Sequence, residues 1–409
     1  MFDKNADRLD YLLTPGDYTT LGRMEVNHPG NTADRPKTIR YYNPSLGTVH
    51  PVQRPLSWAR VDSFQFDGQG TSNWVVQGLT VSRPERNSVI RGRASNITVD
   101  ACLFEHAVQY NVRIRNASHC TIQRCVIRDT IQMFDKNGLP RDSSGIQIGR
   151  VDEEILGIKV LDNEIYNVGD CIQTTDGRLE PIRRVEVLIE GNDLYLDSSR
   201  YIGETNTTWD ENAIDLKAGS DTPESTTIRT NRMWGFRHRA AQGALGEIIV
   251  VQRFSRNVLV EDNIMGDAPR GMKDENWPRH PEFAVDTPRH IVFRNNQFYE
   301  IRDYSELDKG AITKPITSGI KFIGNYFARS DFIADQTPPG YQGTLPRYTG
   351  NTRVEVGDIQ RHESKNPPVP YDEAMNATAT APFGYDTYER KRWTGPELAM
   401  GAIPAARAP

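Results

Sequence analysis

The sequence of 409 residues is first notable for what it has little of. It contains no run of 18 apolar residues, so no transmembrane helix is expected, and its amino terminus has no apolar signal region. Basic residues are not in excess: the net charge of −5 and the pI of about 6.0 disfavour a nucleic-acid partner. The eight histidines lack metal-ligand spacing and no CxxC pair exists, so zinc is not predicted. The cysteines are few, and we expect them to be buried, reduced and structural: Cys102, Cys120, Cys125 and Cys171.

Helical spacing of apolar residues is also missing, and a short motif stands in its place. The motif reads apolar, any, apolar, any, any, Asn, and it recurs from the middle of the chain to residue 325. Its copies are Ile158–Asn163, Val187–Asn192, Thr226–Asn231, Val258–Asn263, Ile291–Asn296 and Ile320–Asn325. Two earlier copies, Ile97–Cys102 and Cys120–Cys125, carry cysteine in the asparagine position, and Trp74–Leu79 is a further copy. Repeats of this period indicate a solenoid.

Within each copy, apolar and polar residues alternate with the period of a half-buried strand. Asparagine at the end of the copy favours a tight turn, because it tolerates left-handed backbone angles, and stacked amides would form a ladder. The distance between ladder positions varies from 23 residues (Cys102 to Cys125) to 39 (Asn192 to Asn231). A constant corner with loops of variable length predicts an all-β, right-handed parallel β-helix. A β-sandwich or a propeller is the alternative, but the shortest repeats leave no room for a four-stranded blade.

A second family of strands follows irregular segments in the same repeats. Its copies are Gly145–Gly149, Cys171–Thr175 and Ala213–Lys217, with fainter ones at Ile249–Gln252, Phe283–Asp286 and Ala311–Thr313. Alternation turns the isoleucines of these strands inward and places Gln147, Gln173 and Asp215 in one outward column.

Three parts are expected along the chain. Residues 1–60 form an N-terminal cap and first coil, residues 61–330 form the β-helix that carries the catalytic site, and residues 331–409 form an irregular C-terminal tail packed on the solenoid. Because one long core is built by stacking, we expect a monomer.

The outward face of the second strand family combines acidic, basic and amide side chains. In register, Asp170 and Gln173 would lie one coil below Asp215, close enough for a calcium site formed by Asp170, Glu211 and Asp215. Lys217 stands two residues beyond Asp215. The substrate-binding residues expected on this face and in its loops are Arg113, Arg115, Gln147, Arg150, Gln173, Arg178, Arg237 and Arg253.

This combination suits β-elimination on a polymer of uronic acids. The uronate carboxylate must be neutralised, by calcium or by arginine, before a base can remove the weakly acidic proton on C5. Lys217 is the predicted base, and an acid then helps the O4 leaving group depart. The candidate acids, in order, are Arg239, His238 and Tyr201.

At residues 30–40 the sequence resembles the opening coil of the alginate lyase and chondroitinase B family of parallel β-helix polysaccharide lyases. The asparagine ladder is similar to that of pectate lyases. Residues 217–220 resemble the catalytic-lysine strand of family-nine pectate lyases, with Asp170 and Asp215 in the place of their calcium aspartates. Family-six lyases pair a lysine base with an arginine acid about one coil further on, a role that the resemblance gives to Arg239. The resemblance covers residues 15–330, but the acidic calcium motif is thinned to one aspartate per coil.

The resemblance therefore implies a polysaccharide lyase acting on an alginate-, pectate- or glucuronate-type polymer, with alginate-like polymers favoured. A secreted or periplasmic location follows from this substrate class. A glycoside hydrolase of the polygalacturonase type and a uronate C5-epimerase remain alternatives on the same fold. A non-catalytic, tailspike-like solenoid that binds carbohydrate is the alternative without chemistry.

Overall fold

The structure, a computed structural model, describes the chain in segments. These are residues 10–42, 59–82, 87–130, 143–149, 154–174, 184–196, 212–217, 219–220, 225–236, 246–252, 255–268, 270–275, 289–301, 312–313, 320–323, 325–328, 347–349 and 352–354. The chain divides into two compact units, residues 1–192 and residues 193–409, and each is described by itself. Helix is confined, in these segments, to the 3₁₀ turn η1 (Thr19–Leu21). No helix among the described residues has the length and apolar character needed to span a membrane.

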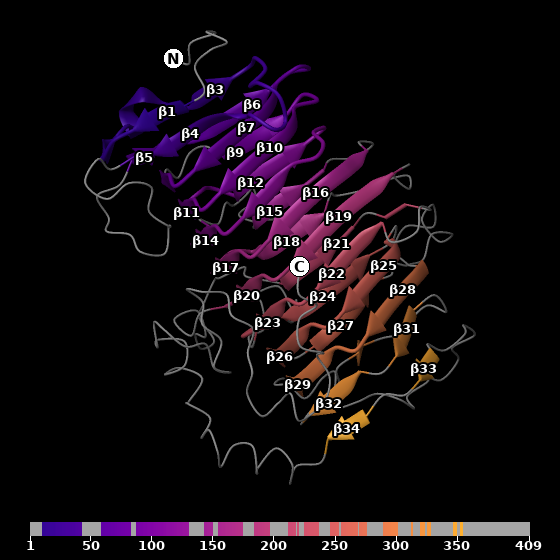
Figure 1. Ribbon diagram of the computed structural model, residues 1–409. Helices are drawn as coiled ribbons and strands as arrows, with labels where there is room; N and C mark the ends of the chain where they lie inside the picture. Colours follow the sequence, from indigo (N-terminus) through magenta and orange to yellow (C-terminus); the bar gives the residue numbers. More distant parts are fainter. Residues whose placement is uncertain are drawn as a thin grey trace, which may run out of the picture. The chain divides into compact units, whose positions relative to one another are not determined.

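Unit 1 consists of coils of three strands, and each strand of a coil joins a different sheet (Figure 1). Sheet A contains, in order, β1 (Asp10–Leu13), β4 (Lys37–Tyr41), β7 (Ser72–Gln77), β10 (Ser95–Asp100), β13 (Thr121–Gln123), β16 (Ile155–Leu161) and β19 (Val185–Glu190). Sheet B contains β2 (Gly16–Asp17), β5 (Ala59–Val61), β8 (Thr80–Ser82), β11 (Leu103–Glu105), β14 (Val126–Arg128) and β17 (Glu164–Tyr166). Sheet C contains β3 (Met24–Val26), β6 (Phe64–Asp67), β9 (Ser88–Arg91), β12 (Tyr110–Arg115), β15 (Ser144–Ile148) and β18 (Asp170–Thr174).

Unit 2 repeats this arrangement. Its part of sheet A contains β22 (Thr226–Arg229), β25 (Arg256–Glu261), β28 (Arg289–Arg294), β31 (Ile320–Ile323) and β33 (Arg347–Thr349). Its part of sheet B contains β20 (Asp193–Tyr195), β23 (Arg232–Trp234), β26 (Ile264–Ala268), β29 (Gln297–Ile301), β32 (Tyr326–Ala328) and β34 (Thr352–Val354). Its part of sheet C contains β21 (Asn212–Leu216), β24 (Glu247–Gln252), β27 (Arg270–Glu275) and β30 (Ile312–Thr313).

Strand pairing within both units is parallel, as in β4 with β7 and β25 with β28, and the chain returns to the same sheet at every third strand. This connectivity defines a parallel β-helix, so the predicted all-β solenoid is confirmed. A β-sandwich and a propeller are excluded, since both are built from antiparallel sheets.

The core is formed by apolar side chains that occupy the same register position in successive coils. In sheet A of unit 1, one such row is fully buried and consists of Ile39, Val76, Val99, Ile122, Val160 and Ile189. The matching row of unit 2 contains Ile228, Val260, Phe293 and Phe322, and the last two rings stack at 4.9 Å between centroids. Burial of each such side chain contributes about 1.5–3 kcal/mol, and a coil gains it only when a neighbouring coil covers it.

The predicted asparagine ladder is present in both units. In unit 1, Asn163 donates from Nδ2 to Oδ1 of Asn192 at 2.9 Å, and the backbone N–H of Cys125 donates to Oδ1 of Asn163 at 2.9 Å. In unit 2, Nδ2 of Asn231 donates to Oδ1 of Asn263 at 3.0 Å, and the pattern continues through Asn296 to Asn325. The amides of Asn163, Asn263 and Asn296 also donate to a backbone carbonyl of the preceding coil, and the amide of Asn231 donates to the carbonyl of Arg229 in its own coil.

One detail of the predicted turn is wrong. The ladder residue itself does not take left-handed angles; the residue before it does. Asp162, Asp262 and Thr230 have φ of 52°, 54° and 55°, and Gly191 has φ of 69°. The asparagine side chain is needed for the ladder bonds, so the turn in the backbone falls on its neighbour. Thr230 is strained there, because a β-branched residue rarely adopts this conformation.

The second strand family corresponds to sheet C. The predicted strands near residues 145, 171, 213 and 249 are β15, β18, β21 and β24. The strand that follows β24 in sheet C is β27, whereas the predicted segment Phe283–Asp286 lies outside the described residues. The sequence interpretation overlooked β27 because only Pro269 separates it from β26, and long loops were expected before every strand of this family.

Strand pairing is described near both ends of the chain. Parallel pairs start at residue 10, where β1 pairs with β4, and β33 and β34 pair with β31 and β32 at residues 347–354. In the sequence, β34 is directly preceded by Gly350-Asn351, as β32 is by Gly324-Asn325, so the asparagine motif recurs once more than the sequence interpretation counted. The rest of the expected tail, residues 331–346, 350–351 and 355–409, lies outside the described segments.

All four cysteines are free and buried, as expected. In the ladder, the backbone N–H of Cys102 donates to Sγ of Cys125 at 3.4 Å. Burial raises the pKa of Cys120 from 9.0 to about 12, and burial together with the neighbouring Cys102 raises the pKa of Cys125 well above its usual range.

We predict that Asn263→Ala lowers the free energy of unfolding by about 2–4 kcal/mol, because it leaves the carbonyl of Ile228 and the backbone N–H of Asn231 buried without partners. Denaturant unfolding measures this change. Thr227→Ala, at a half-buried outward position of the neighbouring coil, is the control and should change stability by less than about 0.5 kcal/mol. Equal losses in the two variants would contradict a structural role for the ladder.

We also predict that Cys120 and Cys125 react with alkylating reagents at pH 8 only after unfolding, because only the thiolate is nucleophilic and the folded chain keeps both thiols protonated. Mass spectrometry of labelled peptides identifies the residues. Since the folded-state pKa of Cys120 lies above the unfolded value of 9.0, its contribution to stability is complete below that pH and is lost as the pH rises beyond it. Rapid labelling of both thiols in the folded protein would contradict their burial.

Candidate functional site

In unit 1, the outward face of sheet C carries the predicted amide column. Gln147 and Gln173 are register partners on β15 and β18, and the alternate residues Ile146 and Ile172 are fully buried in the core. Nε2 of Gln147 donates to Oε1 of Gln173 at 3.0 Å, and Nε2 of Gln173 donates to Oδ2 of Asp170 at 2.9 Å. The structure therefore joins three residues that the sequence had assigned to one site.

These hydrogen bonds have a direction. An ionised carboxylate only accepts, so Asp170 requires the amide N–H₂ of Gln173, and the carbonyl of Gln173 then requires the N–H₂ of Gln147. The carbonyl oxygen of Gln147 is left as a buried acceptor without a partner. An unmet buried acceptor of this kind costs about 1–3 kcal/mol.

Two of the predicted arginines of unit 1, Arg113 and Arg115, lie on strand β12 of the same sheet. Arg113 is the register partner of Gln147, and its guanidinium lies 4.8 Å from the centre of the Tyr110 ring. Arg115 pairs in register with Arg91, whose side chain forms an exposed ion pair with Asp67 at 2.8 Å. Guanidinium groups beside aromatic and amide groups suit the binding of a carboxylate and of sugar hydroxyls.

In unit 2, the predicted base, Lys217, directly follows β21 and lies beside Asp215, which was predicted as a calcium ligand. Nζ of Lys217 forms an ion pair with Oδ2 of Asp215 at 2.8 Å, and Nε2 of Gln252 on the next coil donates to Oδ1 of Asp215 at 3.0 Å. The side chain of Asp215 is 3% exposed and that of Lys217 is 17% exposed. The buried carboxylate thus fixes the position of a lysine that solvent can still reach, and this contact by itself favours the ammonium form of Lys217.

Three charged residues of sheet C were missed by the sequence analysis. Oε1 of Glu247 on β24 binds Nη1 of Arg270 at 3.0 Å and Nζ of Lys273 at 3.3 Å, both from β27. The signal available in the sequence was the pair Met272 and Lys273, an inward and an outward position of β27 that match Ile249 and Val250 of β24 in register. It was not used because β27 itself was overlooked.

Several predicted site residues lie outside the described residues. They are Arg150, Arg178, Tyr201, Glu211, Arg237, His238, Arg239 and Arg253. Asp170 and Gln173 belong to unit 1, whereas Asp215 and Lys217 belong to unit 2, so the register predicted between them stays a prediction. Among the described residues, no three His, Cys, Asp or Glu side chains gather closely enough to hold a metal ion.

The clearest perturbed tyrosine lies on a different sheet. Tyr166 of sheet B accepts a hydrogen bond from Arg128 at 3.0 Å, and Arg128 also binds Glu105 at 2.8 Å. Burial, followed by the charge of Glu164, raises the pKa of Tyr166 to about 12. A tyrosine held in this way on sheet B is part of a structural ion-pair network and is not a candidate acid for sheet C.

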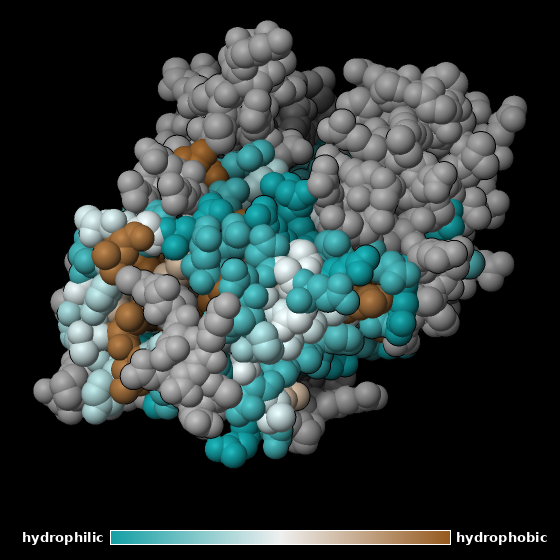
Figure 2. Space-filling model, turned by 90° about the horizontal axis from the view of Figure 1, so that it is seen from above, coloured by the Kyte–Doolittle hydropathy of each residue, from teal (hydrophilic) through white to brown (hydrophobic). Residues whose placement is uncertain are grey.

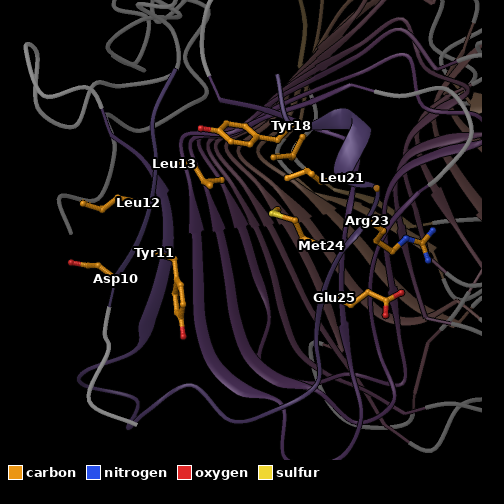
Figure 3. Close-up of a pocket in the computed structure, with 11 residues that line it drawn as sticks. Asp10, Tyr11, Leu12, Leu13, Tyr18, Leu21, Arg23, Met24 and Glu25 are labelled. Atoms are coloured by element: carbon orange, nitrogen blue, oxygen red, sulfur yellow. The ribbon is translucent and has the colours of Figure 1, made fainter. Parts of the chain in front are cut away.

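A cavity of about 720 Å³ lies at the first coil of unit 1. Figure 3 shows Leu13, Leu21 and Met24 pointing into it, while Arg23 and Glu25 point away. The cavity is therefore the end of the apolar core, where no earlier coil is stacked among the described residues, and none of the predicted site residues lines it. On the face drawn in Figure 2, hydrophilic residues cover most of the described surface, and hydrophobic residues form small separate groups.

No family model matches the sequence, and no curated protein matches it. Solved structures do match. An alginate lyase from Paenibacillus sp. is 14% identical, with 86% of this chain and 94% of that chain covered and a TM-score of 0.45. The A-module of a mannuronan C-5 epimerase from Azotobacter vinelandii is 12% identical, with 86% and 92% covered and a TM-score of 0.48. Pectate lyase Pel9A is 13% identical, with 91% and 77% covered and a TM-score of 0.48. Bacteriophage tailspike proteins also match. The chain is thus structurally similar to β-helix polysaccharide lyases, to an epimerase and to tailspikes, and at these identities the likeness concerns the fold alone.

Proposed function

We propose that the protein is a polysaccharide lyase that cleaves a uronic-acid polymer by β-elimination, with Lys217 as the base. The observation that carries the proposal is the position of Lys217, an outward lysine that is partly exposed and is held at 2.8 Å by a buried aspartate. A lone surface lysine would have no such fixed partner. An alginate-, pectate- or glucuronate-type polymer is the proposed substrate, and a secreted or periplasmic location follows from it.

The reaction breaks the C5–H bond and the C4–O4 bond of one uronate residue. Lys217, as the free amine, takes the C5 proton; the electron pair forms the C4–C5 double bond, and O4 leaves with a proton from an acid. Since Asp215 favours the ammonium form of Lys217, this lysine must lose a proton before it acts. Cationic groups around the substrate carboxylate assist this loss, because they disfavour a further positive charge on Lys217. Arg239, His238 and Tyr201 stay the predicted acids. Arg113, Arg115 and the amides of Gln147 and Gln173 are the proposed substrate contacts of unit 1.

The alternative functions differ from a lyase in their products. A C5-epimerase would return a proton to C5 after removing one, and it would form no double bond. A hydrolase of the polygalacturonase type needs two carboxyl groups free to act as acid and base, whereas both oxygens of Asp215 are bonded to Lys217 and Gln252. A tailspike-like binder would release neither an unsaturated sugar nor a new reducing end. Ultraviolet absorbance of the unsaturated uronate, measured beside reducing ends, separates these functions across a set of uronate polymers.

We predict that Lys217→Arg lowers kcat by at least about a hundredfold, because arginine keeps the ion pair with Asp215 but does not become a neutral base. Lys217→Ala should be equally inactive while retaining its fold. Ultraviolet absorbance measures the rate, and thermal unfolding measures the fold. Lys159→Ala, an exposed outward lysine on sheet A, is the control and should retain full activity. A Lys217→Arg protein with near wild-type kcat would remove Lys217 from the mechanism.

Calcium stays a prediction that rests on Asp170, Glu211 and Asp215. Both oxygens of Asp215 accept bonds from Lys217 and Gln252, so an ion at this carboxylate would have to displace those donors. We expect exhaustive chelation to lower the lyase rate and added Ca²⁺, rather than Mg²⁺, to restore it, because calcium accepts a larger and less regular set of oxygen ligands. Full activity after chelation would show that cationic side chains neutralise the substrate carboxylate.

A further inference from the structure

The outward face of sheet C in unit 1 carries an arginine that has no acidic partner among the described residues. Arg115 is the last residue of β12 and follows Ile114, whose side chain is buried in the core at 1% exposure. The side chain of Arg115 is half-buried, and its Nε–H lies in the interior without an acceptor. Burial without a hydrogen-bond partner is unfavourable for a guanidinium N–H, so packing alone does not account for this position.

The neighbours of Arg115 in the sheet explain why it has no partner. On one side lies its register partner, Arg91 of β9. On the other side, the register that joins Ile114 to Ile148 places Gly149 next, and a glycine offers neither a carboxylate nor an amide side chain. Arg91 and Arg115 are therefore like charges on adjacent strands, whose backbones are about 4.8 Å apart. Such a pair is unfavourable unless an anion compensates both charges.

One carboxylate lies beside this pair, and it is bonded to Arg91. Asp67 of β6 is the register partner of Arg91, and its Oδ2 accepts from Nε of Arg91 at 2.9 Å and from Nη2 at 2.8 Å. Gln65 donates to the same oxygen at 3.3 Å. One negative and two positive charges leave a charge of +1 on Asp67, Arg91 and Arg115. All three side chains reach the surface, since those of Arg91 and Asp67 are 45% and 35% exposed and that of Arg115 is half-buried.

We propose that Arg115 binds the carboxylate of a uronate residue, and that Asp67 limits this cluster to one such group. A planar guanidinium matches a carboxylate through two parallel N–H donors. Asp67 holds Arg91 and repels a second anion, so a single carboxylate is accommodated. The inference deepens the proposed function, on which it rests for the class of ligand, a polyuronate. The cluster is a binding subsite of unit 1 and takes no part in bond cleavage.

The test compares two substitutions with opposite expected effects. Arg115→Gln removes the unbalanced charge and should raise Kd for polygalacturonate or alginate by about threefold to tenfold. Asp67→Asn removes the competing negative charge, releases Arg91 and should lower Kd by about twofold to fivefold. Both differences should shrink as salt is added. Calorimetry measures Kd, and the background is Lys217→Arg, so that turnover does not consume the polymer.

Controls identify effects that do not come from the cluster. Arg60→Gln, at an exposed position of β5 on sheet B, removes one positive charge elsewhere in unit 1 and should leave Kd unchanged. Dextran, a neutral polymer, should bind all variants alike. Thermal unfolding of Asp67→Asn should change little, because an exposed ion pair adds little to stability. Equal Kd values for Arg115→Gln and Arg60→Gln overturn the subsite. A Kd of Asp67→Asn that is not below the wild-type value overturns the role of Asp67.

Activity measurements separate this inference from the proposed function. Weaker polyuronate binding on loss of Arg115 supports the subsite even if no polymer yields an unsaturated product, in which case only the lyase proposal fails. Lyase activity with unchanged KM and Kd in Arg115→Gln overturns the subsite alone. Absence of both binding and activity with every polyuronate overturns both.

Discussion

The structure depends on the parallel stacking of coils in register. One coil exposes the backbone groups of its three short strands and cannot bury its own apolar side chains, so each coil is stable only when a neighbour pairs with it. The asparagine ladder holds the sharpest corner to the same register: Asn163 bonds Asn192 in unit 1, and Asn231, Asn263, Asn296 and Asn325 bond in succession in unit 2. A shift of one residue at this corner would turn the core side chains outward.

The same register orders the outward side chains of sheet C into columns. In unit 1 the column presents amides and an arginine, and Asp170 gives the amides a common direction. In unit 2 buried carboxylates hold lysines that are partly exposed: Asp215 holds Lys217, and Glu247 holds Lys273. Each of these carboxylates is thus bonded to a cationic side chain.

Much of the fold was predictable because the repeat is local. Alternation within Ile158–Asn163 and its copies defines a strand and a corner, and a corner that returns after loops of different length has few solutions other than a solenoid. The column of Gln147 and Gln173 followed from the same alternation. Prediction failed where the local signal was weak. Only one residue separates β27 from β26, so β27 was overlooked, and the strained backbone angle falls on Thr230 rather than on Asn231.

The sequence by itself determined the strand period, the ladder, the outward position of Lys217 and the burial of the cysteines, because each follows from residues close together in the chain. Only the tertiary structure decided which side chains meet across coils. That Gln252 bonds Asp215, that Arg270 neutralises Glu247 and that Lys273 stands in the column of Asp215 depend on the register between strands 23 to 37 residues apart. Loop length does not reveal this register, since hydrogen bonding between whole strands sets it.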